Sequence, residues 1–119
     1  MLKSLKLNGH HVFGFEVSEE LNQEDYMYVL DPLLEKYGEE KVSLLLYFGP
    51  HFKKITFGAA LEDLQLGIKH FNHFKKIAMV SDISWIKHSI NIFAPLIPAD
   101  VKTFSNDCLE DAKNWILEN

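Results

Sequence analysis

The chain of 119 residues is 47% hydrophobic, which predicts a single domain over residues 1–119 built around one core. Its net charge is −5 and its twelve cationic side chains are all lysine, which argues against nucleic-acid binding because such proteins concentrate arginine for guanine and phosphate contacts. The lysine pairs 53–54 and 75–76 are expected to be ordinary solvated surface. The single Cys108 excludes an internal disulfide, and no apolar run approaches the roughly 18 residues that cross a bilayer. We therefore expect a soluble, cytoplasmic protein.

The first elements along the chain are predicted to form a β-hairpin. Leu2 to Leu7 alternates between apolar and polar residues, as an edge strand does. Asn8-Gly9 is a strong two-residue turn signal, because both residues tolerate positive φ. His10 to Val17 is expected to return as the antiparallel partner strand.

A helix is predicted next, because six apolar or aromatic residues recur at helical spacing: Tyr26, Val29, Leu30, Leu33, Leu34 and Tyr37. Asn22 is its expected N-cap, with Asp25 in the first turn, and Gly38 its expected end. Pro32 lacks an N–H and crowds the preceding turn, so a kink or a split is expected there.

The middle of the chain carries the pattern of a central parallel strand. Val42 to Phe48 is almost continuously apolar, as in a strand covered on both faces. Gly49-Pro50 is expected to end this strand, and residues 51–58 to form an unusually apolar loop. A helix from Ala59 to Phe71 is predicted to follow.

The last third of the chain repeats strand and helix twice. Ile77 to Val80 is predicted to be a second buried strand, followed by a helix that Ser84 caps and two prolines end. Val101 to Phe104 is expected to be a short strand at the other sheet edge. Asp107 and Glu110 suggest a capping box for a final helix. The predicted order is ββαβαβαβα.

Three segments of this last third carry a family resemblance: Ile-Ala-Met-Val-Ser-Asp-x-x-Trp at 77–85, Asp-Val-Lys-Thr-Phe at 100–104 and Ala-x-x-Trp-Ile at 112–116. With the N-terminal hairpin, they resemble the SpoIIAA-like family of small bacterial proteins, which is similar to the STAS domains of anti-sigma-factor antagonists and sulphate transporters. The resemblance implies an α/β fold with a mostly parallel five-stranded sheet, an antiparallel N-terminal edge hairpin and helices on the sheet faces. CRAL-TRIO lipid-carrier domains have a similar architecture.

The chain departs from the anti-sigma antagonists at one point. Those proteins carry a phosphorylatable residue in an Asp-x-Ser motif after a central strand, and residues 48–58 contain none. Thr56 is the only hydroxyl there, in a different context. The resemblance therefore implies a non-enzymatic STAS-like binding or regulatory module without the phosphorylation switch.

Aromatic residues give the strongest indication of a binding site. Phe48, Phe52 and Phe57 flank the end of one predicted strand, and Asp82 and Trp85 follow the end of another. One interpretation is a site for a small apolar or amphipathic ligand or a partner protein. The alternative is that these side chains cap the core themselves.

An enzyme with a site at the strand ends is the alternative function, using Asp82, Ser84, Cys108 or His51. These residues form no complete catalytic set. Ser84 is explained as an N-cap and Cys108 as a small packing thiol. No glycine-rich phosphate loop is present, so no cofactor is predicted.

The six histidines do not predict a metal site. His70 and His73 could share a helix face, but no cysteine or carboxylate motif completes a ligand set. His10 and His11 are expected to lie on a strand and point to opposite faces.

A homodimer is the expected form of any self-association. Lys3 and Lys6 guard the first strand against edge pairing. The dimer contact is therefore predicted to include Phe52, Phe57 or Trp85.

Overall fold

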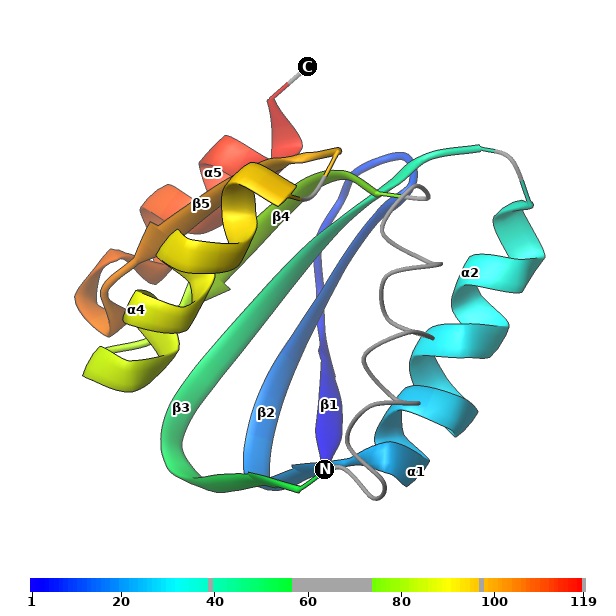
Figure 1. The fold of residues 1–119 in the computed structure, drawn as a ribbon. Helices are drawn as coiled ribbons and strands as arrows, with labels where there is room; N and C mark the ends of the chain where they lie inside the picture. The colour runs from blue at the N-terminus through cyan, green and yellow to red at the C-terminus, as the bar shows by residue number, and fades with distance from the viewer. Residues whose placement is uncertain (39, 57–73, 97, 119) are drawn as a thin grey trace.

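A five-stranded sheet forms the centre of the protein in a computed structural model that describes residues 1–38, 40–56, 74–96 and 98–118. Its strands lie in the order β1-β2-β3-β4-β5. β1 is antiparallel to β2 and every other neighbouring pair is parallel, which confirms the predicted fold class (Figure 1). The bounds are β1 Leu2–Leu5, β2 Val12–Asn22, β3 Val42–Thr56, β4 Phe74–Val80 and β5 Asp100–Phe104.

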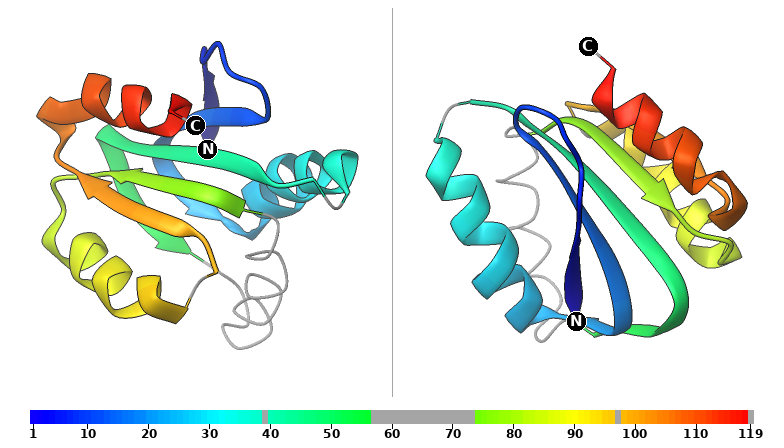
Figure 2. Two further views of the ribbon diagram at one scale, coloured as in Figure 1. Left: turned by 90° about the horizontal axis from the view of Figure 1, so that it is seen from above. Right: turned by 180° about the vertical axis from the view of Figure 1, so that it is seen from behind.

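Helices cover both faces of this sheet (Figure 2). α2 and α4 pack on one face and α5 on the other. The helical segments are α1 Gln23–Asp25, the π-helix η1 Tyr26–Leu30, α2 Asp31–Tyr37, α4 Ser84–Phe93, the 3₁₀ turns η3 Ala94–Leu96 and η4 Asn106–Cys108, and α5 Leu109–Leu117. None of the helices in the described residues is long and apolar enough to span a membrane. The predicted helix from Ala59 to Phe71 lies outside the described residues, as does Phe57.

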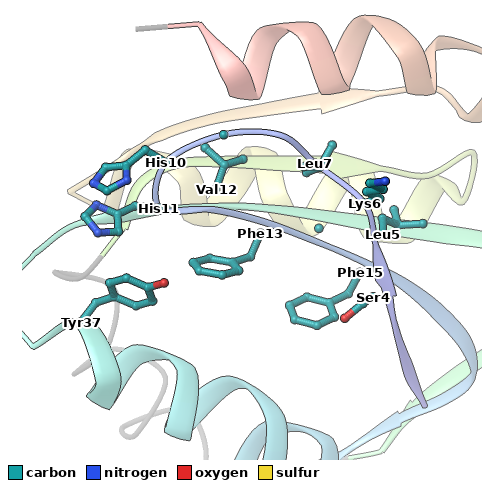
Figure 3. Close-up of a pocket in the computed structure, with 12 residues that line it drawn as sticks. Ser4, Leu5, Lys6, Leu7, His10, His11, Val12, Phe13, Phe15 and Tyr37 are labelled. Carbon is teal, nitrogen blue, oxygen red and sulfur yellow. The ribbon is translucent and has the colours of Figure 1, made fainter.

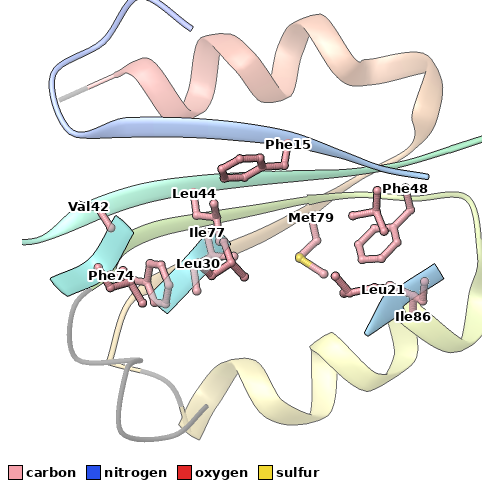
Figure 4. Close-up of a cluster of buried hydrophobic side chains, with 12 residues drawn as sticks. Phe15, Leu21, Leu30, Val42, Leu44, Phe48, Phe74, Ile77, Met79 and Ile86 are labelled. Carbon is pink, nitrogen blue, oxygen red and sulfur yellow. The ribbon is translucent and has the colours of Figure 1, made fainter. Parts of the chain in front are cut away.

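Side-chain alternation along β3 divides the core into two layers. Leu44 and Phe48 pack toward α2 and α4, and Figure 4 shows them with Ile86 of α4. Leu45, between them in sequence, packs toward α5 with Ile116. Because both faces are covered, the strand is almost continuously apolar, as the sequence predicted.

The first helical segment begins and ends as predicted. The Asn22 side chain accepts a hydrogen bond from the Asp25 N–H at 3.0 Å, and the Asp25 carboxylate accepts one from the Asn22 N–H at 3.1 Å. These reciprocal bonds form a capping box. The segment changes from π-helix to α-helix just before Pro32, but Leu30 at the boundary keeps helical φ and ψ of −76° and −46°, so the helical backbone is not split there. Gly38 ends α2 with φ of 56°.

The predicted end of β3 is wrong. The strand continues through Gly49-Pro50 to Thr56, so residues 51–56 are strand rather than loop. Pro50 is tolerated for two reasons. The register on β2 shifts between Val17 and Glu19, and the pairing with β4 stops at Tyr47. A proline without an N–H fits such an irregular, one-sided stretch of strand.

Two predicted helix caps are also wrong. Ser84 is the first residue of α4 and makes no capping bond; the Ile83 N–H before it donates to the Ser81 hydroxyl at 3.0 Å. Asp107 does not cap α5, because a 3₁₀ turn precedes that helix. Glu110 pairs instead with Lys113 at 3.2 Å.

The pair at 75–76 is only half solvated, contrary to the sequence prediction. Lys75 is exposed, but Lys76 is buried beneath the end of α5. Its ammonium group donates to the carbonyls of Trp115 at 3.0 Å and Glu118 at 2.8 Å, and lies 4.9 Å from the Trp115 ring centre. Lys76 thus satisfies carbonyls that the helix end leaves open, where positive charge is favoured.

Candidate functional site

Among the described residues of the predicted aromatic site, Phe48 and Phe52 lie together and Trp85 lies apart from them. The Phe48 side chain is only 2% exposed, and the Phe52 ring meets it edge-on with centroids 4.9 Å apart. Both belong to the core on the α2 and α4 face. Trp85 is 53% exposed at the start of α4 and makes no ring contact with either phenylalanine in the described structure.

Asp82 has a structural task at the same end. Its carboxylate accepts a hydrogen bond from the Asn106 N–H at 2.9 Å, and the Asn106 side-chain amide donates to the Phe48 carbonyl at 3.3 Å. These two bonds join the middle of β3 and a residue just after β4 to the turn that precedes α5. Asp82 thus accepts the first N–H of the 3₁₀ turn η4, while the N-cap of α5 itself, Cys108, makes no side-chain capping bond.

The side chains proposed for an enzyme do not converge either. Cys108 accepts a hydrogen bond from the Ser105 hydroxyl at 3.4 Å, while His51 and Ser84 are exposed. No hydrogen bond joins any two of Asp82, Ser84, Cys108 and His51 within the described residues. A nucleophile without a base in reach has no catalytic partner.

The opposite end of the sheet is hollowed, because the hairpin opens. β1 pairs with β2 only from Leu2 to Leu5, and residues 6–11 then bow away from β2. Leu5 and Leu7 pack into the core on the α5 side, which holds this segment toward α5. Gly9 is so close to α5 that a Cβ there would lie 2.5 Å from the Leu117 side chain. The predicted tight Asn8-Gly9 turn is therefore wrong, and the positive φ of the connection falls on His11, at 58°.

A hollow of about 400 Å³ lies beside the bowed segment, β2 and α2 (Figure 3). Its aromatic wall is formed by Phe13, Phe15 and Tyr37. The Phe13 and Tyr37 rings are 5.4 Å apart. Other apolar and polar residues complete the lining: Ser4, Leu5, Lys6, Leu7, Gly9, His10, His11, Val12 and Gly14.

A second hollow of about 240 Å³ lies against the same turn. It is bordered by the first residues of β3 and β4 and by the end of α5. Its lining is more polar: Gly9, His10, His11, Val12, Lys41, Ser43, Lys75, Ile116, Leu117 and Glu118.

The two histidines of the turn lie against each other, not on opposite faces of a strand as predicted. Their ring centres are 3.8 Å apart, because both residues precede β2 and follow the turn instead of the strand's alternation. The His11 ring meets Tyr37 edge-on at 4.6 Å, and its Nε2 lies 3.0 Å from the Glu40 carboxylate. No group of three metal-ligating side chains occurs among the described residues.

The sequence contained one signal for this second hollow. Lys41 immediately precedes a buried strand, and Lys75 lies just before the predicted start of the next one. Neighbouring parallel strands begin at the same edge of a sheet, so lysines at their starts lie close together. The opening of the hairpin had no comparable signal, because it depends on contacts between Leu7, Gly9 and α5.

Comparison with known proteins identifies the family. The sequence matches the SpoIIAA-like family over residues 12–117, and the chain belongs to that family, as the sequence resemblance predicted. The fold is similar to the crystal structure of an uncharacterized protein of the DUF3478 family with a SpoIIAA-like fold from Shewanella loihica PV-4. The TM-score is 0.72 at 22% identity, covering 98% of this chain and 92% of that one. No curated protein matches the sequence.

Proposed function

We propose that this protein is a non-enzymatic binding module that takes a small amphipathic ligand in the hollow beside the open hairpin and α2. The observation that carries the proposal is the 400 Å³ space with an aromatic wall and polar groups at its rim. Ligand pockets in proteins commonly enclose about 300–1,000 Å³ and combine an apolar lining with a few polar groups.

The main chain of β2 adds polar anchors to this hollow. The His11 carbonyl accepts the Ser43 N–H, so it points toward β3. Main-chain groups alternate sides along a strand, and those of Val12 therefore point away from β3, toward the hollow. β1 pairs with β2 only as far as Gly14, so Val12 is beyond the reach of that ladder. A ligand can use this N–H and C=O as a strand partner would.

The hollow can be tested by filling it from an exposed position. Ser4 lines the hollow, whereas its neighbour Lys3 does not, and both side chains are exposed on β1. Ser4→Trp is expected to weaken binding of the neutral dye Nile red by about tenfold or more, because the indole occupies the ligand space. Lys3→Trp is the matched control and should bind the dye as the wild type does.

Fluorescence titration measures both variants, and native mass spectrometry of the wild type reports any co-purified ligand. The proposal fails if the wild type shows no saturable dye binding. It also fails if Ser4→Trp and Lys3→Trp bind the dye equally well.

A partner protein, including a second copy of this chain, is the other candidate for binding. Trp85 is 53% and Ile92 57% exposed on α4, and large apolar side chains in the open are the residues that interfaces use. Of the other predicted site residues, Phe48 and Phe52 belong to the core on the α4 face, and Asp82 is exposed just before α4. If a second copy covers this surface, Trp85→Ser is expected to weaken the dimer in analytical ultracentrifugation.

A further inference from the structure

The two hollows adjoin the same hairpin turn. Both are bordered by residues 9–12, and His10 and His11 line each of them. The larger hollow has the aromatic wall, and the smaller one lies where β3 and β4 begin. A ligand that enters the larger hollow can therefore extend a polar end past the turn into the smaller one.

The smaller hollow concentrates positive charge in an acidic protein. Lys41 and Lys75 both line it and are exposed, and neither forms an ion pair within the described residues. His10 lies between the two hollows. The whole chain has a net charge of −5, so this local excess of cations differs in sign from the average surface.

Two carboxylates lie at or beside the smaller hollow and reduce its excess of positive charge. Glu40 lies 3.0 Å from His11 and is engaged there. Glu118 lines the hollow, while its main-chain carbonyl accepts a hydrogen bond from Lys76. An incoming anion thus meets two unpaired lysine ammonium groups and one glutamate.

From this charge pattern we infer that the ligand is a single-chain amphiphile with an anionic head group, held by Lys41, Lys75 and His10. The inference rests on the proposed function, because it names the ligand class of the same site. The apolar chain packs against Phe13 and Tyr37 in the larger hollow. The carboxylate or phosphate ester accepts charge-assisted hydrogen bonds from the lysines, which are stronger than bonds between neutral groups.

The experiment compares two ligands that differ only in the head group. Decanoate and neutral 1-decanol compete with Nile red for the wild type, at concentrations below micelle formation. Decanoate is expected to bind about tenfold more tightly than decanol. In Lys41→Gln/Lys75→Gln this preference should fall to about twofold, with the affinity for decanol unchanged.

A matched control uses the other lysine pair of the chain. Lys53 and Lys54 are exposed on β3 and line neither hollow. Lys53→Gln/Lys54→Gln removes the same net charge and should keep the preference for decanoate. Glu118→Gln removes the opposing carboxylate and should strengthen decanoate binding about twofold.

The outcomes separate this inference from the proposed function. If the wild type binds decanoate and decanol equally tightly, the ligand does not need an anionic head group, although the hollow can still be a binding site. A preference that survives in Lys41→Gln/Lys75→Gln, or falls equally in the control pair, overturns the assignment to these lysines. Displacement of decanoate by acetate or inorganic phosphate at similar concentration overturns the amphiphile and indicates a free-anion site. The proposed function itself is refuted if neither amphiphile displaces the dye and Ser4→Trp binds the dye as tightly as the wild type does.

Discussion

Large aromatic side chains lie in different surroundings at the two ends of the parallel strands. Toward the carboxyl end, the Phe48 and Phe52 rings meet edge-on and join the core. At the amino end, Phe13 and Tyr37 line a hollow instead. Aromatic residues near a strand end thus leave room for a ligand only where the backbone diverges beside them.

Backbone paths explain the difference. Open α/β sheets usually bind ligands at their carboxyl ends, where loops diverge from the strands. Here β3 continues as a strand to Thr56, so residues 49–56 extend the sheet where a loop would have diverged. The divergence occurs instead at the hairpin, where β1 leaves β2 after the Leu5–Gly14 pair.

The largest expected effect tests whether the carboxyl end is core. Phe48→Ala should lower the free energy of unfolding by about 3–5 kcal/mol, because it opens a cavity at a side chain that is 2% exposed. Phe13→Ala should cost less than half as much, because Phe13 is only partly buried and already borders a hollow. Urea denaturation measures both. A cost below about 1 kcal/mol for Phe48→Ala would mean that this end is a cavity and not core.

The next largest effect on stability distinguishes the adjacent Lys75 and Lys76 at the amino end of the strands. Lys76→Met should destabilise the fold by about 2 kcal/mol, because it leaves the carbonyls of Trp115 and Glu118 without their charged donor. Lys75→Met should change stability by less than about 0.5 kcal/mol, since Lys75 is exposed. Thermal unfolding of the two variants is the measurement. Equal costs would contradict the buried role of Lys76 and the availability of Lys75 for an anion.

Local patterns predicted most of the fold. The apolar run at Val42–Phe48 placed the central strand, and Asn22 and Gly38 marked the ends of the first helical segment because their effects act within one turn. Those patterns failed where contacts between residues far apart in the sequence set the path of the backbone. Examples are the bowing of residues 6–11 and the continuation of β3 through Pro50.

The candidate site was predicted less well than the fold for the same reason. Phe48 and Phe52 lie in contact within β3, a strand that the Gly-Pro pair was predicted to end after Phe48. The hollow depends on how Leu7 and Gly9 pack against other elements, which no local pattern encodes.

A smaller effect distinguishes Asp82, which binds the turn before α5, from Asp107, which was predicted to cap that helix. Asp82→Ala should cost about 1 kcal/mol, because the Asn106 N–H loses its acceptor. Asp107→Ala should be close to neutral, since Asp107 is exposed and does not cap the helix. Neither variant should alter dye binding at the hairpin. If Asp82→Ala weakened dye binding while leaving stability unchanged, Asp82 would be a ligand contact and the two ends of the sheet would share one site.

The smallest effect on stability, and the test of the partner surface, concerns Trp85. Trp85→Ser should change the free energy of unfolding by less than about 0.5 kcal/mol, because the side chain is 53% exposed and makes no ring contact with Phe48 or Phe52. If a second copy covers this surface, the same substitution should shift sedimentation toward the monomer in analytical ultracentrifugation.

A substitution at Trp85 distinguishes loss of the dimer from loss of the fold better than a substitution at Phe52 does. A charge at Phe52 would disturb the core contact with Phe48, so a shift in sedimentation could follow from partial unfolding. Trp85→Ser leaves that contact in place. A wild type that is monomeric at all concentrations, or a dimer unaffected by Trp85→Ser, rejects the predicted interface and assigns the carboxyl end to the core alone. Dye binding that persists in the same variant then locates binding at the amino end, where the hairpin opens.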